Sequence, residues 1–124
     1  MHKVINNDFE ILNVNNYIDS NFEKTIPLVS IIMPCHNSAQ TIKASIESVI
    51  KQTFKEWELL IVNDFSSDES KNIIENYSNK DKRIILINTD YQSGAAIARN
   101  LAIKKSSGRF ISFLDSDDLW ENQN

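Results

Sequence analysis

The chain has 124 residues, which is enough for one compact domain and too few for two. Its hydrophobic fraction of 41%, charged fraction of 24% and net charge of −4 are typical of a soluble globular protein. These values argue against a nucleic-acid-binding surface, which needs clustered Lys and Arg. No apolar run is long enough for a signal peptide or a membrane span. We therefore expect a cytoplasmic protein, and action at the inner face of the membrane would need a partner or residues outside this sequence.

Residues 1–26 form a first segment that differs from the rest in composition. They are rich in asparagine, and four apolar residues have the spacing of one short amphipathic helix: Ile11, Val14, Ile18 and Phe22. A loosely ordered leader fits the same residues equally well, so both interpretations stay open. We expect the domain itself to cover residues 27–124.

Four short apolar runs are predicted to be strands that are buried on both faces of a sheet. They are rich in β-branched and aromatic residues and show little alternation of polar and apolar positions. Each run ends at a proline, an asparagine or an aspartate. The runs are Leu28–Met33, Trp57–Val62, Ile84–Ile87 and Phe110–Leu114.

Segments with helical periodicity separate these strands. In the first segment, Ile42, Ile46, Val49 and Ile50 fall on one face. The second segment is predicted to open at the capping-box spacing of Ser66-Ser67-Asp68-Glu69.

A third helix is predicted to begin at Gly94 and to end near Ser106-Ser107-Gly108. Its alanines would form a small-residue face close to the sheet: Ala95, Ala98 and Ala102. The complete order β-α-β-α-β-α-β requires right-handed crossovers and a parallel sheet, so we predict an α/β fold.

Polar and acidic side chains follow each predicted strand. Ligands of an open parallel sheet bind outside the carboxyl ends of its strands, so these residues are the candidates for a site. The four segments are Pro34-Cys35-His36-Asn37, Asn63-Asp64-Phe65-Ser66-Ser67-Asp68, Asn88-Thr89-Asp90-Tyr91 leading to Gly94, and Asp115-Ser116-Asp117-Asp118.

The segment Asp115-Ser116-Asp117-Asp118 indicates a metal site. Its carboxylates repel one another by about 4 kcal/mol per pair at a separation of ~4 Å and an effective dielectric constant of ~20. A Mg²⁺ or Mn²⁺ ion would remove this penalty, because such ions take oxygen ligands and bridge carboxylates to a diphosphate. The alternative is an N-cap for a helix that opens at Leu119-Trp120, although a cap needs only one such residue.

Several common chemistries are excluded by what the sequence lacks. The lone Cys35 permits no intrachain disulfide and no thiolate metal cluster. No Gly-x-Gly-x-x-Gly follows the first strand, and there is no Walker-type Gly-Lys-Ser/Thr. A response-regulator receiver would carry acidic residues after its first strand, and a haloacid-dehalogenase-type phosphatase would carry its Asp-x-Asp there.

Four segments in order resemble the family 2 glycosyltransferases, inverting enzymes with a GT-A fold that use nucleotide-sugar donors. The resemblance covers Pro27 to Trp120. It implies a Rossmann-like fold of the GT-A type with a mostly parallel sheet. The segments that carry it are Val29 to Asn37, Ile61 to Asp68, Gly94-Ala95-Ala96-Ile97-Ala98-Arg99-Asn100, and Phe113 to Trp120 with its DXD motif.

The resemblance implies a role for each matching residue. Asp64 would accept hydrogen bonds from the base, which is most often uracil in this family. Asp117 would be the chief ligand of Mg²⁺ or Mn²⁺, with Asp115 near the ribose and the metal. The implied donor-nucleotide residues are Pro34, His36, Asn37, Asp64, Gly94, Arg99, Asn100, Asp115 and Ser116.

Two residues depart from the family's pattern. Phe65 stands where a glycine is usual, and His36 stands where a tyrosine usually packs near the base. For His36 a structural role is as compatible with the sequence as a ligand contact. For Arg99 a structural ion pair is the alternative to a contact near the diphosphate.

The implied reaction transfers a sugar from a nucleotide-diphosphate sugar, with UDP-sugar expected, to a saccharide, a glycolipid or another hydroxyl acceptor. The expected setting is cell-surface polysaccharide or glycoconjugate synthesis. In the family, the acceptor site and the catalytic base follow the DXD motif, so we expect the base beyond Asn124 and regard the fold as cut off after the motif. A non-catalytic nucleotide-sugar-binding or interaction module is the alternative.

Overall fold

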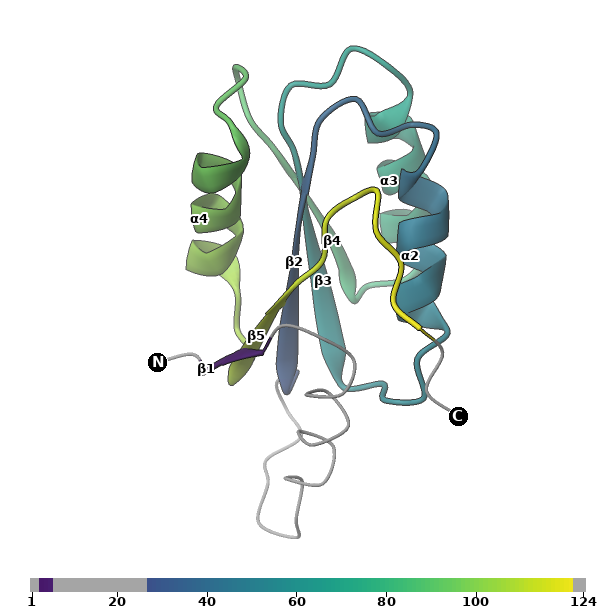
Figure 1. Cartoon of the computed structure of the whole chain (residues 1–124), viewed down its shortest axis with the longest axis vertical. Helices are drawn as coiled ribbons and strands as arrows, with labels where there is room; N and C mark the ends of the chain where they lie inside the picture. Colours follow the sequence, from purple (N-terminus) through teal and green to yellow (C-terminus); the bar gives the residue numbers. More distant parts are fainter. Residues whose placement is uncertain (1–2, 6–26, 122–124) are drawn as a thin grey trace, which may run out of the picture.

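The computed structural model describes residues 3–5 and 27–121. Five parallel strands form one sheet in the order β1-β5-β2-β3-β4. Helices α2 and α3 cover one face of the sheet and α4 covers the other, which gives three layers (Figure 1). The elements are β1 (Lys3–Ile5), β2 (Val29–Cys35), α2 (Ile42–Ile50), β3 (Trp57–Asn63), α3 (Ser70–Lys80), β4 (Ile84–Asn88), α4 (Ala95–Lys105) and β5 (Phe110–Phe113).

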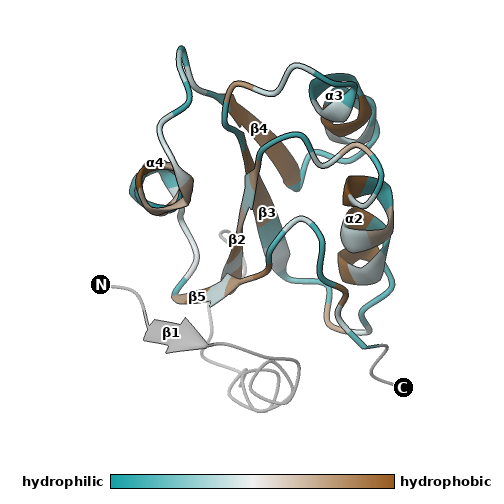
Figure 2. Ribbon diagram, turned by 45° about the horizontal axis from the view of Figure 1, so that its top comes forward, coloured by the Kyte–Doolittle hydropathy of each residue, from teal (hydrophilic) through white to brown (hydrophobic). Residues whose placement is uncertain are grey.

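The central strands β2 and β3 are apolar on both faces because both faces are covered. Ile31 packs in a cluster with Ile46 of α2 and Ile74 of α3. Its neighbour Ile32 points the other way and packs with Ala98 of α4. Figure 2 shows hydrophobic residues along the central strands, between α2 and α3 on one side and α4 on the other. This two-sided burial confirms the prediction from the continuous apolar runs.

β1 was not predicted. It lies within residues 1–26 and pairs in parallel with β5, with Lys3 opposite Phe110. The helical spacing of Ile11 to Phe22 falls outside the described residues. The boundary between a leader of residues 1–26 and a domain of residues 27–124 stays a prediction.

Two details of the helix predictions are wrong. α3 begins at Ser70 rather than at Ser66, and Asp68 Oδ1 accepts a hydrogen bond from Ser70 N at 2.9 Å. In α4, Ala98 is buried against the sheet as predicted, but Ala95 is exposed. Ala95 is in the first turn of α4, beside the loops at the carboxyl edge of the sheet.

Pro34 lies inside β2 although proline cannot donate a hydrogen bond to a sheet. The carbonyl of Ile32 accepts Leu114 N on the side of β5, whereas that of Cys35 accepts Asp64 N on the side of β3. Pro34 lies two residues after Ile32, so its backbone nitrogen and carbonyl point to the same side, toward β5. β5 ends opposite Ile32, so no donor is required at Pro34.

A buried polar cluster connects the strands at the amino end of the sheet. Ser30 Oγ donates to Glu58 Oε2 at 2.6 Å and accepts Gly108 N at 2.8 Å. Ser107 N donates to the same Glu58 oxygen at 2.7 Å. A Cβ on Gly108 would lie 2.7 Å from Ser30 N, so only glycine allows this close approach.

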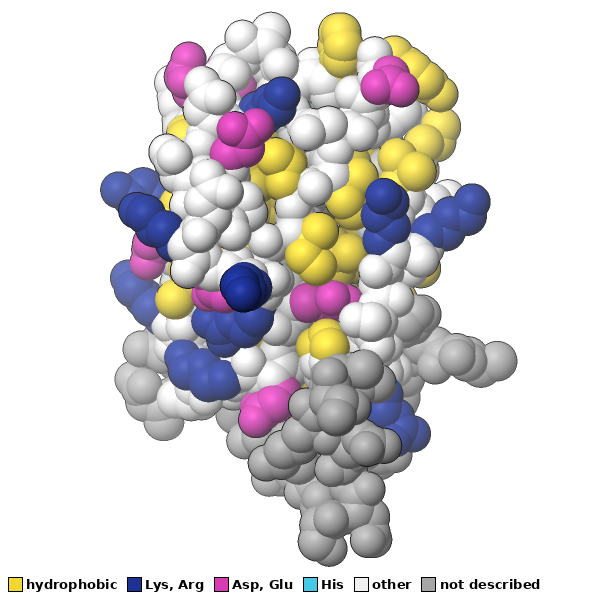
Figure 3. Space-filling model, turned by 180° about the vertical axis from the view of Figure 1, so that it is seen from behind, with side chains coloured by type: hydrophobic (Ala, Val, Ile, Leu, Met, Phe, Trp, Pro, Cys, Tyr) yellow, Lys and Arg dark blue, Asp and Glu magenta, His cyan; other side chains and the backbone are white. Residues whose placement is uncertain are grey.

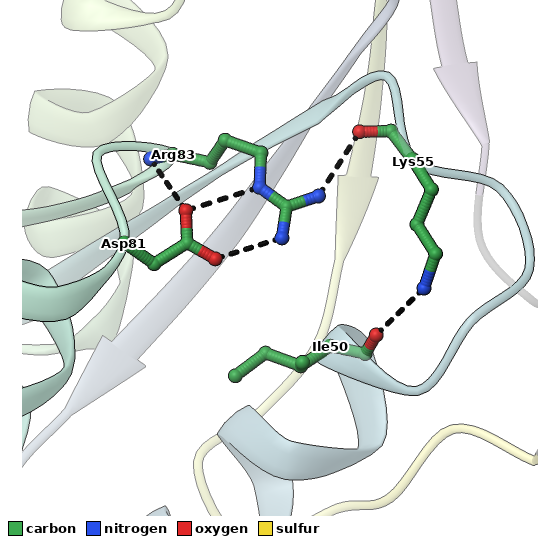
Figure 4. Close-up of polar contacts among 4 residues, drawn as sticks. All are labelled: Ile50, Lys55, Asp81 and Arg83. Atoms are coloured by element: carbon green, nitrogen blue, oxygen red, sulfur yellow. Dashed lines mark hydrogen bonds and ion pairs between the residues drawn. The ribbon is translucent and has the colours of Figure 1, made fainter.

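Arg83 joins the loop between α2 and β3 to the loop between α3 and β4 at this end of the sheet (Figure 4). Its Nη2 donates to Asp81 Oδ2 at 2.7 Å and its Nη1 to Lys55 O at 3.2 Å. Lys55 Nζ donates to Ile50 O at 3.0 Å, and the Arg83 guanidinium stacks 3.9 Å above the Trp57 ring. The Arg83 guanidinium also holds the pKa of Asp81 below its ordinary value.

The face seen from behind in Figure 3 is mixed in charge: Lys and Arg side chains are interspersed with Asp and Glu and with apolar side chains. Among the described residues, no helix is both long enough and apolar enough to cross a membrane.

Candidate functional site

A hollow of about 760 Å³ lies at the carboxyl edge of the sheet, among the loops that follow β2, β3 and β5 and the start of α4. These loops gather at the upper end of the sheet in Figure 1. Gly94 and Asn100 are not among the residues that line the hollow. The predicted site residues that do line it are Pro34, His36, Asn37, Asp64, Arg99, Asp115, Ser116 and Asp117.

The loop after β2 is bonded to the loop after β3. His36 Nδ1 lies 2.7 Å from the carbonyl oxygen of Asp64. A carbonyl oxygen only accepts, so Nδ1 carries a proton and donates, and Nε2 is the acceptor, which lies 3.4 Å from Asn37 Nδ2. Asn37 has a φ of 50°, and its Oδ1 accepts Ser67 N at 2.8 Å. These bonds set the orientation of the His36 ring at the rim of the hollow.

Asp64 is only 3% exposed and holds the loop between β4 and α4. Its Oδ1 accepts Ser93 N and Ser93 Oγ, each at 2.8 Å, and Thr89 Oγ1 at 3.0 Å. Its Oδ2 accepts Gly94 N at 2.8 Å. Burial raises the pKa of Asp64, but the bonds from Ser93, Gly94 and Thr89 outweigh it and bring the pKa below its ordinary value. Each carboxylate oxygen has two lone pairs, so Oδ2 can accept one further bond.

Gly94 therefore contributes to the site through its bond to Asp64 and does not itself line the hollow. Its φ of 92° is in a region that favours glycine, and its amide bonds to Asp64. α4 begins at the next residue and carries Arg99 toward the hollow. Asn100 is one position further along the helix, and it does not line the hollow because consecutive helical residues do not share a face. Its side chain is exposed.

The acidic segment after β5 forms a turn and not a helix. Asp118 N donates to Asp115 O at 3.0 Å, and no helix follows as far as Glu121 in the described chain. The N-cap interpretation of this segment is therefore wrong. Ser116 in the turn is 7% exposed, and its Oγ lies 2.7 Å from Ser38 Oγ in the loop after β2.

Asp115, Asp117 and Asp118 bring their carboxylates together at the surface. Their oxygen atoms lie within 4.8 Å of one another, and all three side chains are exposed. Arg99 Nη2 lies 3.4 Å from Asp115 Oδ1, so the ion pair considered for Arg99 is present. A set of carboxylate oxygens alone suits a hard cation such as Mg²⁺ or Mn²⁺, and Asp118 adds a third oxygen donor to the two predicted.

Asp68 and Cys35 belong to segments that follow predicted strands, but they were not among the residues predicted to bind the donor or the metal. Asp68 lines the hollow, and its Oδ2 accepts Ala39 N at 3.1 Å from the loop after β2. Burial raises the pKa of Asp68, and the bonds from Ser70 and Ala39 outweigh it, so the pKa is lowered. The capping-box spacing had placed Asp68 in a helix start, which hid this role.

Cys35 is a buried thiol at the end of β2. Burial raises its pKa, so the neutral thiol is favoured at the wall of the hollow. Its position directly after a predicted strand was the available signal that it would line the site.

The family model for glycosyl transferase family 2 matches residues 30–124. The chain therefore belongs to glycosyl transferase family 2. This confirms the resemblance that four short motifs had indicated.

Curated relatives agree with this membership. The UDP-Glc:alpha-D-GlcNAc-diphosphoundecaprenol beta-1,3-glucosyltransferase WfgD of Escherichia coli is 56% identical over 93 residues, which are 75% of this chain and 36% of that protein. The putative teichuronic acid biosynthesis glycosyltransferase TuaG of Bacillus subtilis is 42% identical over 95 residues, which are 77% of this chain and 38% of that protein. The chain thus spans well under half the length of either relative.

Solved structures show the same fold. TarS 1-349 of S. aureus in complex with UDP is 36% identical with a TM-score of 0.69, over 74% of this chain and 28% of that chain. The mannosyltransferase PcManGT of Pyrobaculum calidifontis, in complex with GDP-Man and Mn²⁺, has a TM-score of 0.70 at 20% identity, over 90% of this chain and 35% of that chain. These likenesses confirm the predicted α/β fold of the GT-A type.

Proposed function

We propose that this chain binds the nucleotide-sugar donor of a glycosyltransferase that acts in cell-surface polysaccharide synthesis. The donor is a UDP-sugar, and the acceptor is a hydroxyl of a saccharide or a glycolipid. The observation that carries the proposal is the hollow at the carboxyl edge, which joins the buried carboxylate of Asp64 to the exposed carboxylates after β5. Family membership supports the reaction class.

The choice of UDP follows from two kinds of support. The name of the E. coli relative specifies UDP-Glc, and TarS was solved with UDP and with UDP-GlcNAc. In this chain, the Asp64 Oδ2 lone pair that remains can accept the N3–H of uracil, which cytosine lacks. We therefore assign Asp64, with His36 and Asn37 at the rim, to the base end of the hollow. The proposed location is the cytoplasm.

The other end of the hollow would hold the diphosphate. Asp117 and Asp115 would bind Mg²⁺ or Mn²⁺, and Asp118 offers a further oxygen. Such an ion, when bound, neutralises the charge that develops on the departing nucleoside diphosphate. Arg99 lies beside Asp115, where its guanidinium orients that carboxylate and contributes positive charge toward the diphosphate.

Calorimetry with UDP tests the proposal. The chain should bind UDP in the presence of Mn²⁺ or Mg²⁺ and bind it at least ~10-fold more weakly when the metal is chelated. Asp117→Asn should remove this metal-dependent gain without unfolding the protein, because its side chain is exposed. Asp90→Asn is the matched control, since it removes the same charge from an exposed aspartate outside the hollow.

A folded wild-type chain that binds no UDP with either metal would contradict the proposal. Metal-dependent UDP binding without transfer to any acceptor, and without hydrolysis of the UDP-sugar, would favour the non-catalytic binding module for residues 1–124.

A further inference from the structure

Ser45, on the buried face of α2, contacts the backbone of the acidic segment at two points. Its side chain is 0% exposed. Its Oγ lies 2.9 Å from Ser116 O and 2.5 Å from Asp118 O. A hydroxyl has one proton, so the two carbonyls share it. The backbone carbonyls of the two residues that flank Asp117 are thus held by a side chain that does not line the hollow.

Two further polar residues of α2 continue this contact toward Glu121. Trp120 N donates to Ser48 Oγ at 3.1 Å, and Gln52 Nε2 donates to Glu121 O at 2.7 Å. Ser45, Ser48 and Gln52 are spaced by three and four residues and therefore share one face of the helix. One face of α2 thus holds the backbone after β5 from Ser116 to Glu121.

The acidic carboxylates themselves are exposed and have little that orients them. Asp115 is paired with Arg99 at 3.4 Å, and both side chains are partly solvated, at 53% and 38% exposure. Exposed side chains are not packed into a single geometry, so the backbone that carries them decides how closely their oxygens approach. Groups that orient metal ligands commonly change metal affinity by about 10-fold to 100-fold when they are removed.

We propose that Ser45 is a positioning residue for the acidic site: its buried hydroxyl sets the spacing of the Asp115, Asp117 and Asp118 carboxylates. The hydroxyl acts through the backbone and touches neither donor nor metal. This inference rests on the proposed function, because it assigns Ser45 to the cation site described there.

The experiment compares Ser45→Ala with two other buried serines in the full chain. Ser30→Ala removes a bonded, 0% exposed hydroxyl at the opposite end of the sheet. Ser112→Ala removes a 0% exposed hydroxyl that has no hydrogen-bond partner among the described residues. Three quantities are measured for each: Mn²⁺ affinity by electron paramagnetic resonance, UDP affinity with and without Mn²⁺, and the midpoint of thermal unfolding.

Ser45→Ala should weaken Mn²⁺ binding by about 10-fold or more and leave metal-free UDP binding unchanged. Ser30→Ala should lower the unfolding midpoint but keep the wild-type Mn²⁺ affinity, and Ser112→Ala should change neither. Ser45→Cys keeps the shape of the side chain but donates weakly, so it should give the same loss, and it replaces Ser45→Ala if that variant does not fold.

The outcomes separate the two proposals. If the wild type binds Mn²⁺ and the Ser45 variants bind it equally well, Ser45 is not a positioning residue and the proposed function stands. The same conclusion follows if Ser30→Ala weakens Mn²⁺ binding as much as Ser45→Ala, because the effect then comes from general destabilisation. If the wild type binds neither Mn²⁺ nor UDP, the proposed function fails and the role of Ser45 fails with it.

Discussion

Replacing Asp64 by asparagine exchanges one carboxylate oxygen for an amino group at a position where every neighbour donates. If the remaining oxygen takes the place of Oδ1, the new amino group faces Gly94 N, which is now 2.8 Å from Oδ2. If the amide is turned over, the amino group faces Ser93 N, Ser93 Oγ and Thr89 Oγ1 instead. Both orientations leave at least one part-buried donor without an acceptor.

The size of the effect follows from these bonds. Loss of one hydrogen bond to a charged group costs about 1.5–3 kcal/mol. The bonds that remain also weaken, since charge-assisted hydrogen bonds are roughly twice as strong as neutral ones. We expect Asp64→Asn to lower the free energy of unfolding by about 3 kcal/mol. For a chain of 124 residues, whose unfolding entropy is about 2.1 cal/mol/K per residue, that lowers Tm by roughly 12 °C.

The same residue predicts a dependence on pH. The pKa of Asp64 is below its ordinary value because of these hydrogen bonds, so the charged form stabilises the fold. That contribution is fully present above the unfolded pKa and is lost as pH falls through the lower folded pKa. The stability difference between wild type and Asp64→Asn should therefore be constant from about pH 8 to about pH 5 and shrink below about pH 4.

Thermal unfolding followed by circular dichroism, repeated across this pH range, measures both effects. Asp90→Asn is the control, because Asp90 is exposed and the same substitution there should leave Tm unchanged. A Tm of Asp64→Asn within ~3 °C of wild type would refute the reasoning. So would a stability difference that persists unchanged in acid.

Two further predictions concern residues beside the site and between the helices. Phe65 has a φ of 57° and a side chain that is 57% exposed, so Phe65→Gly should raise the free energy of unfolding by about 1 kcal/mol, measured by denaturant unfolding. Phe65→Ala is the control: it removes the same ring but keeps the Cβ, and equal stability of the two variants would contradict the strain argument. Burial and the Glu47 carboxylate, which accepts Tyr77 Oη at 2.6 Å, raise the pKa of Tyr77 to about 12. Tyrosinate absorbance should show this late titration in the wild type and lose it in Tyr77→Phe. The stability that the Tyr77–Glu47 hydrogen bond contributes should be present below about pH 10 and lost as pH rises through about 12. A wild-type titration complete by about pH 11 would contradict this assignment.

Much of the fold was predictable because the information is local. The run from Ile31 to Met33 is apolar at every position, a pattern that is typical of a strand covered on both faces. The structure has helices on both faces of the sheet. The start of α4 directly after Gly94 was also predictable. Gly94 has a φ of 92°, a backbone conformation that glycine adopts without strain.

Other predictions failed where a local sequence signal competed with a hydrogen-bond partner that is distant in sequence. The spacing of Ser66 and Glu69 indicated a helix start, but Ser66 Oγ accepts Asn37 N across to another loop, and Asp68 bonds to Ala39 and Ser70 instead. A partner that is distant in sequence decided the outcome. β1 was missed because a short strand at the edge of a sheet has no clear pattern of its own and exists through its pairing with β5.

The sequence by itself determined the class of fold, the edge of the sheet that carries the site and most of the residues gathered there, because strand ends and acidic runs can be read along the chain. Only the tertiary structure decided what each of these residues does. In the folded chain, Asp64 holds the loop between β4 and α4, Gly94 bonds to Asp64 without lining the hollow, and Ser45 contacts the backbone of the acidic segment. The physical reason is that a buried hydrogen-bonding group must find a partner, and the partner's identity depends on which distant segments packing brings together.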